Sequence, residues 1–159
     1  MKSAVIYISV IAALGGFLFG FDTAVISGTV ESIKSPEFGF GLTAGELGFA
    51  VASVLIGSAI GAWYAGIAAI KFGRVKVMLI ASVLFSLSAI GSAFAFNLWD
   101  FSFWRLVGGL GVGIAAVIAP AYIAEVSPAH LRGRLGSLQQ LAIAIGLLVS
   151  FISNYVLAN

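Results

Sequence analysis

Five long apolar segments constrain this chain more than any other feature of its sequence. They cover roughly residues 4–27, 46–69, 75–96, 101–123 and 136–158. A transmembrane helix needs about 20 mostly apolar residues, and each segment reaches that length. Because only helices and closed barrels satisfy their backbone groups inside a bilayer, segments of this length indicate helices. The pattern therefore predicts an all-α membrane protein with five spans.

The composition agrees with this prediction and excludes several classes of function. Of the 159 residues, 61% are hydrophobic and 9% are charged, whereas soluble domains carry about 25% charged residues. Without cysteine, and with His130 as the single histidine, the chain lacks the usual ligands of zinc and iron–sulfur sites. We expect no cofactor, no metal site and no enzymatic activity. The net charge of +2 is not gathered on an aromatic-rich face, so nucleic acid is not an expected partner.

The basic residues predict the orientation in the membrane. The predicted connections lie at residues 28–45, 70–76, 97–100 and 124–135. Cytoplasmic connections are enriched in lysine and arginine. Six of the eight basic residues lie at the amino end and in the second and fourth connections: Lys2, Lys71, Arg74, Lys76, Arg132 and Arg134. The amino terminus is therefore predicted to be cytoplasmic.

Two opposite charges lie inside the apolar segments. Asp22 lies about 6 residues, or ~9 Å, before the predicted outer end of the first helix. Arg105 lies about 5 residues, or ~8 Å, into the fourth helix from the same side. A fixed ion pair would lower the cost of burying both charges. The alternative is functional: Asp22 exchanges a proton while Arg105 holds or releases the carboxylate, as membrane-embedded carboxylates do in transporters.

Small and polar residues mark the faces on which the helices are expected to pack. Gly57 and Gly61 form a GxxxG pair, and four glycines lie within residues 108–113. In the fifth helix, helical spacing places five residues on one face: Gln140, Ala144, Leu147, Phe151 and Asn154. Gln140 can make a hydrogen bond to another helix, or it can bind a ligand that carries hydroxyl groups.

Three stretches of the sequence resemble the sugar porters of the major facilitator superfamily. They are Gly15–Gly28 (GGFLFGFDTAVISG), Arg105–Gly113 (RLVGGLGVG) and Pro120–Arg134 (PAYIAEVSPAHLRGR). The resemblance implies two six-helix halves built from inverted three-helix repeats, with alternating access to a central sugar site. On this interpretation residues 1–159 form an incomplete amino-terminal transmembrane half.

The resemblance also implies roles for individual residues. Asp22 matches the proton-coupling carboxylate and Arg105 its partner. Phe19 and Gln140 match residues near the sugar. Four residues match a cytoplasmic charge network that closes the inner gate: Arg74, Glu125, Arg132 and Arg134. The implied partners are a sugar, a proton, membrane lipid, and either the missing carboxy-terminal half or a second chain.

The sequence departs from the family pattern at three places. Ile70 and Val75 replace an acidic and a basic residue of the family's inner-gate motif, and Leu147 replaces a second glutamine. The chain also stops after the fifth predicted helix, before most of the expected sugar ligands.

The predicted function is therefore the amino-terminal part of a proton-coupled monosaccharide symporter in the plasma or inner membrane. Two alternatives stay open. One is a facilitative uniporter. The other is a truncated, non-transporting membrane subunit in which Asp22 and Arg105 form a structural pair.

Overall fold

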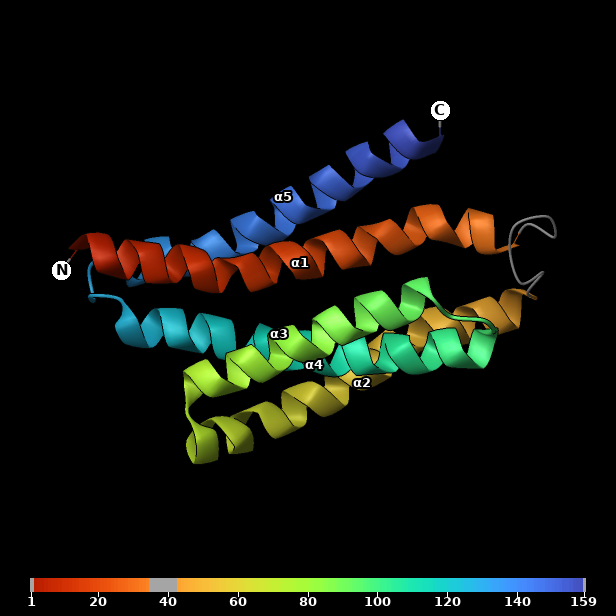
Figure 1. The fold of residues 1–159 in the computed structure, drawn as a ribbon. Coiled ribbons are helices and arrows are strands. Elements are labelled where there is room, and N and C mark those ends of the chain that lie inside the picture. Colours follow the sequence, from red (N-terminus) through yellow and green to blue (C-terminus); the bar gives the residue numbers. More distant parts are fainter. Residues whose placement is uncertain (1, 35–42, 159) are drawn as a thin grey trace. The chain divides into compact units, whose positions relative to one another are not determined.

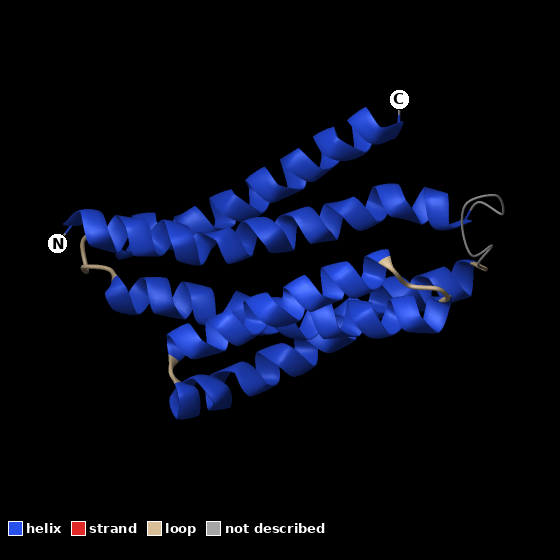
Figure 2. Ribbon diagram, in the orientation of Figure 1, coloured by secondary structure: helices blue, strands red, loops and turns tan. Residues whose placement is uncertain are grey.

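The chain folds into five α-helices that account for nearly all of its described residues. The computed structural model describes residues 2–34 and 43–158. The helices are α1 (Lys2–Lys34), α2 (Ala44–Phe72), α3 (Arg74–Ala93), α4 (Leu98–Val126) and α5 (Arg132–Ala158), shown in Figures 1 and 2. Each contains a segment long and apolar enough to cross a membrane. The all-α membrane fold predicted from the sequence is thus confirmed.

The helices extend past the predicted apolar segments at most of their ends. α1 continues to Lys34 through part of the predicted first connection, and residues 35–42 of that connection lie outside the described residues. α2 and α3 replace most of the predicted second connection, and α3 ends at Ala93 rather than at residue 96. An apolar segment ends where the bilayer ends, whereas a helix ends where its backbone is capped, so the two boundaries differ.

Local sequence explains where the helices of the middle of the chain begin and end. α2 begins with a capping box, in which Thr43 Oγ1 accepts a hydrogen bond from the Glu46 N–H and Glu46 Oε2 accepts one from the Thr43 N–H. α2 ends at Phe72 and is capped by Gly73, whose φ of 83° suits a residue without a Cβ. α4 begins after Asn97, whose Oδ1 accepts a hydrogen bond from the Asp100 N–H at 2.9 Å.

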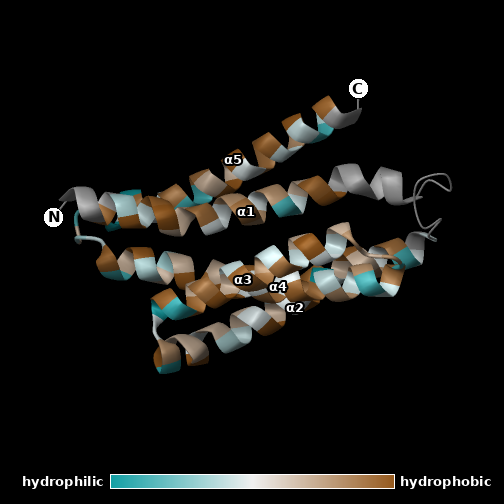
Figure 3. Cartoon of the chain, viewed as in Figure 1, coloured by the Kyte–Doolittle hydropathy of each residue, from teal (hydrophilic) through white to brown (hydrophobic). Residues whose placement is uncertain are grey.

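Apolar side chains cover the outside of the helices. Ile70, Trp63 and Trp99 are 87%, 78% and 73% exposed. Figure 3 shows hydrophobic positions along the middle of the helices and hydrophilic positions mainly toward their ends. Exposed apolar surface of this extent is expected where lipid replaces water around a protein.

The chain forms two compact units, and α1 and α4 each contribute to both. The first unit consists of residues 1–25 and 116–159, and the second of residues 26–115. In α4 the boundary falls at Ala116, the residue whose carbonyl would pair with position 120. Pro120 has no N–H to donate to it, so the helical hydrogen bonding is interrupted there.

α4 packs against both α2 and α3 inside the second unit. Gly111 approaches the backbone of Ala81 in α3, and Gly91 of α3 faces the Trp104 ring. Ser88 Oγ of α3 donates a hydrogen bond to the Trp104 carbonyl at 2.6 Å. Small residues let membrane helices approach closely enough for such contacts, so they define the interior of this unit.

Candidate functional site

Asp22 lies on α1 in a turn that α5 contacts on both sides. Two residues before it, Gly20 approaches the carbonyl of Ile143 so closely that a Cβ there would overlap the α5 backbone. Two residues after it, the Ala24 carbonyl accepts a hydrogen bond from Asn154 Nδ2 of α5 at 3.3 Å. Asp22 itself is half-buried. The helix backbone around this carboxylate is therefore held by α5.

Glycines of both helices lie in the contact between α1 and α5, which we call the α1–α5 seam. A Cβ at Gly16 would lie 2.9 Å from the carbonyl oxygen of Gln139. A Cβ at Gly146 would overlap the carbonyl of Phe17. Close backbone contact of this kind gives membrane helices their packing energy. The seam is formed by Gly16, Phe17, Gly20, Ala24, Gln139, Ile143, Gly146 and Asn154.

A second glycine-lined contact joins α2 to α4, and we call it the α2–α4 seam. A Cβ at Gly109 would overlap the carbonyl of Val54, and one at Gly113 the carbonyl of Ser58. From α2, Gly61 approaches Leu110 in the same way. The GxxxG pair and the glycine-rich stretch singled out in the sequence therefore pack against each other. The seam is formed by Val54, Gly57, Ser58, Gly61, Leu106, Gly109, Leu110 and Gly113.

The two seams repeat one another at constant spacing. Gly16 and Gly20 of α1 correspond to Gly109 and Gly113 of α4, which lie 93 residues later. Their contacts on α5 and α2 correspond as well, because Gln139, Ile143 and Gly146 match Val54, Ser58 and Gly61 at a spacing of 85 residues. The sequence signal was the shared Gly-Gly-x-x-x-Gly at residues 15–20 and 108–113. The repeat supplies an internal reference for every residue of the α1–α5 seam.

Several polar residues of α1 and α5 have apolar residues at the equivalent positions of α4 and α2. Val54 occupies the position equivalent to Gln139, and Ala69 the position equivalent to Asn154. Ala115 occupies the position equivalent to Asp22. Since the equivalent positions of α2 and α4 hold apolar residues, the fold of this glycine-rich helix pair does not require polar groups there.

The two predicted members of the charge pair lie in different compact units. Asp22 belongs to the first unit and Arg105 to the second, so their pairing stays a prediction. Arg105 is 8% exposed and lies seven residues into α4, one turn before the seam glycine Gly109. The depth of Asp22 must be counted from Ile26, where the apolar span of α1 ends, because the helix itself continues twelve residues past Asp22.

The polar face predicted for α5 is divided between two environments. Asn154 hydrogen-bonds to α1, which is the packing role considered for this face, whereas Gln140 is exposed. The preceding residue, Gln139, was not singled out from the sequence, yet it is 8% exposed and lies against Gly16. Its Oε1 has no hydrogen-bond partner among the described residues. Phe19, the predicted aromatic neighbour of the sugar, is half-buried on α1.

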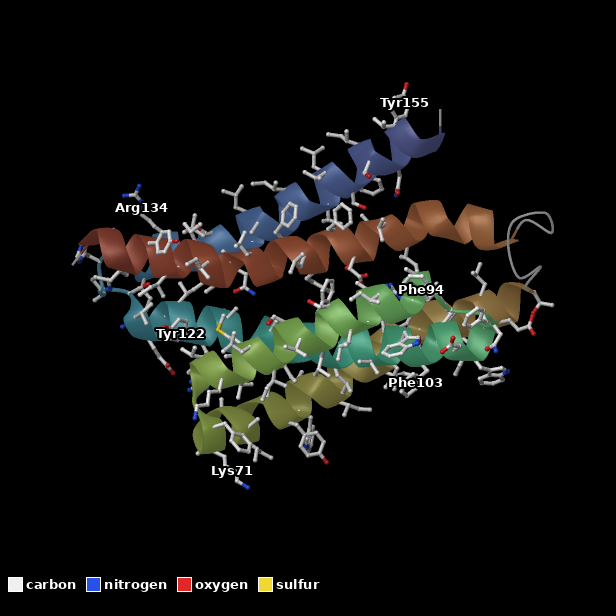
Figure 4. All side chains as sticks on the ribbon, in the orientation of Figure 1. Lys71, Phe94, Phe103, Tyr122, Arg134 and Tyr155 are labelled. Carbon is white, nitrogen blue, oxygen red and sulfur yellow. The ribbon has the colours of Figure 1, made fainter. Side chains whose placement is uncertain are left out.

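The predicted inner-gate residues lie at helix ends where their charges oppose the helix dipoles. Arg74 is the first residue of α3, and Arg132 and Arg134 lie in the first turn of α5. Glu125 is the penultimate residue of α4. Basic residues at amino ends and an acid at a carboxyl end each cost typically ~0.3–1 kcal/mol, so helix stability does not explain them. Figure 4 shows Arg134 projecting away from α1.

The described residues contain no group of three or more histidine, cysteine, aspartate or glutamate side chains that could hold a metal ion. His130, which the sequence interpretation placed in a loop, is exposed in the turn between α4 and α5.

Comparison with known proteins gives a consistent family. The family model described as "Sugar (and other) transporter" matches residues 8–159. The chain is 58% identical to a "Glucose transport protein" of Synechocystis over 97% of its own length and 32% of the relative's. It is 41% identical to a "D-xylose-proton symporter" of Escherichia coli over 99% of its length and 37% of the relative's. The chain thus spans about a third of these relatives.

Solved structures show the same likeness in three dimensions. The proton:xylose symporter XylE of the major facilitator superfamily, bound to 6-bromo-6-deoxy-D-glucose, matches 99% of this chain with a TM-score of 0.88 and 41% identity. The match covers 38% of that structure. A partially occluded, inward-open form of XylE from E. coli matches 97% of the chain, and 42% of the other, with a TM-score of 0.89. The chain therefore belongs to the sugar transporter family of the major facilitator superfamily.

Proposed function

We propose that this chain forms the amino-terminal part of a proton-coupled monosaccharide symporter. Family membership and the relatives named as a glucose transport protein and a xylose–proton symporter support this proposal. The transporter works by alternating access in the cell inner membrane, with its amino terminus in the cytoplasm. The basic residues of the second and fourth connections support that orientation.

The observation that carries the proposal is that Asp22 and Ala115 occupy equivalent positions, and that one is a carboxylate and the other is apolar. Ala115 fills the position of Asp22 in the repeated copy, so the packing of a glycine-rich helix in this fold does not need an acid there. An ionisable residue within a membrane span costs at least ~2.5 kcal/mol on insertion scales and marks an ion or substrate pathway. Asp22 is therefore assigned to carry the proton. Arg105 is assigned as the cation that competes with this proton for the negative charge of the Asp22 carboxylate.

Sugar contact is assigned to Gln140 and Phe19. Gln140 is exposed on this chain, which leaves its amide available to the rest of the transport pathway. An amide both donates and accepts hydrogen bonds, as recognition of a sugar hydroxyl requires. The remaining sugar ligands are assigned to the partner of this chain, either a carboxy-terminal half or a second chain. The inner gate is assigned to Arg74, Glu125, Arg132 and Arg134, in a form weakened by Ile70 and Val75.

The test measures sugar uptake by the natural full-length protein that contains this chain, reconstituted in proteoliposomes. An inward proton gradient should drive accumulation of D-glucose or D-xylose above the external concentration. Asp22→Asn should abolish accumulation and retain sugar exchange without a gradient, because an amide keeps the side chain's shape and cannot carry the proton.

Three other results would contradict the proposal. Undiminished accumulation by Asp22→Asn would make Asp22 and Arg105 a structural pair. Uptake by the unaltered protein that stops at the external sugar concentration would indicate a facilitative uniporter. Absence of both uptake and exchange would indicate a non-transporting membrane subunit.

A further inference from the structure

The α1–α5 seam carries an interhelical hydrogen bond next to the proposed proton carrier. Asn154 Nδ2 donates to the Ala24 carbonyl at 3.3 Å, across 130 residues of sequence. Ala24 is 2% exposed and Asn154 is half-buried, so the bond is partly shielded from the surroundings. Ala24 lies two residues after Asp22, in the same helical turn. A shift of this carbonyl would therefore move the backbone that carries Asp22.

The α1 backbone near Asp22 is rich in glycine and depends on such support. Gly15, Gly16 and Gly20 precede Asp22 within two turns. Glycine lowers helix stability by about 1 kcal/mol per residue relative to alanine. The contact of Gly20 with the Ile143 backbone holds α1 just before Asp22, and the Asn154 bond holds it just after. The carboxylate is thus bracketed by two contacts with the same helix.

The repeated copy lacks both the carboxylate and the amide. There, Gly113 contacts Ser58 as Gly20 contacts Ile143, so the glycine contact is shared. Ala115 replaces Asp22. Ala69, whose methyl group cannot donate a hydrogen bond, replaces Asn154. The amide therefore accompanies the carboxylate and not the glycine packing, which argues that it serves Asp22 rather than helix association.

From this juxtaposition we infer that Asn154 is a positioning residue for Asp22: its hydrogen bond to the Ala24 carbonyl fixes the α1 turn that presents the proton-coupling carboxylate. The inference rests on the proposed function and adds to it a residue outside the predicted proton and sugar sites. Its consequence is specific, because a loosened turn impairs the coupling of sugar to proton movement and leaves sugar binding intact.

The test compares Asn154→Ala with Ser150→Ala in the full-length protein. Ser150 is a matched control, since it is fully buried on the same helix and its counterpart in α2 is Ala65. Interhelical hydrogen bonds in membranes have strengths that correspond to about 3- to 15-fold in an equilibrium. Asn154→Ala should lower proton-driven sugar accumulation by about that factor, with the KM for sugar exchange unchanged. Ser150→Ala should match the unaltered protein, and Asn154→Gln, which keeps an amide donor, should recover most of the accumulation.

Asp22→Asn, measured in parallel, separates failure of the inference from failure of the proposed function. If Asp22→Asn abolishes accumulation and Asn154→Ala leaves it unchanged, the inference is wrong and the proposed function stands. If Asp22→Asn leaves accumulation unchanged, both are wrong. An equal loss of accumulation and exchange in Asn154→Ala would indicate a merely structural role. If Asn154→Ala does not fold, Asn154→Ser replaces it, because serine is too short to reach the carbonyl, and full accumulation by this variant would overturn the inference.

Discussion

The α1–α5 seam and the α2–α4 seam share the same glycine spacing but differ in the polarity of the side chains beside the glycines. Both bring backbones into contact through paired glycines, Gly16 and Gly20 in one and Gly109 and Gly113 in the other. The α2–α4 seam is completed by apolar and small side chains, whereas the α1–α5 seam contains two amides and adjoins a carboxylate. Close packing is therefore the requirement that the two seams share, and the polar groups of the α1–α5 seam have another role.

The largest expected effect tests the shared requirement. Gly20→Val and Gly113→Val should each destabilise the protein by about 3 kcal/mol, because the new side chain overlaps the backbone of the facing helix. Thermal unfolding of the purified full-length protein, followed by tryptophan fluorescence, measures this. Gly66→Ala is the control, since a Cβ at Gly66 meets no atom within 4 Å. Destabilisation by one glycine variant and tolerance of the other would show that the seams are not equivalent in packing.

The next effect concerns the exposed polar position of α5. Gln140→Ala should weaken sugar binding about five- to 150-fold, because a ligand hydroxyl left unpaired costs about 1–3 kcal/mol. Leu55 is the equivalent residue of α2 and is 68% exposed, so Leu55→Ala should leave affinity unchanged. Equilibrium binding of D-glucose and D-xylose to the full-length protein provides the measurement. An unchanged dissociation constant for Gln140→Ala would contradict the sugar contact and favour a hydrogen bond from Gln140 to another helix.

The smallest effect concerns the buried amide of the α1–α5 seam. Gln139→Val gives this seam the side chain that Val54 has in the other, and it removes an Oε1 with no partner among the described residues. Unfolding stability should stay equal or rise by about 1 kcal/mol, since a buried, unsatisfied acceptor is lost.

The converse change, Val54→Gln, should lower the stability by about 1–3 kcal/mol, because it buries a new amide in an apolar contact. Thermal unfolding curves of Gln139→Val and Val54→Gln, recorded in parallel, measure both changes in stability. A marked loss of stability in Gln139→Val would show that the amide has a partner essential to the fold.

Much of the architecture could be predicted from the sequence because hydropathy is a local property. Five spans, the charges at Asp22 and Arg105, and the family followed from segment length and from short motifs. The helix ends were less predictable: α1 continues to Lys34, because polar residues can prolong a helix beyond the apolar segment that precedes them. α2 continues to Phe72, because its backbone is capped only at Gly73.

The membrane helices and the charges inside their spans follow from the sequence, since the bilayer imposes length and apolarity on each segment separately. The packing of α5 against α1 decided which of two adjacent glutamines is buried. One residue turns a helix by about 100°, so Gln139 lies against Gly16 while Gln140 faces outward. It also decided that Asn154 bonds to α1, because that choice depends on which helix lies opposite, and the facing helix is 130 residues away in the chain.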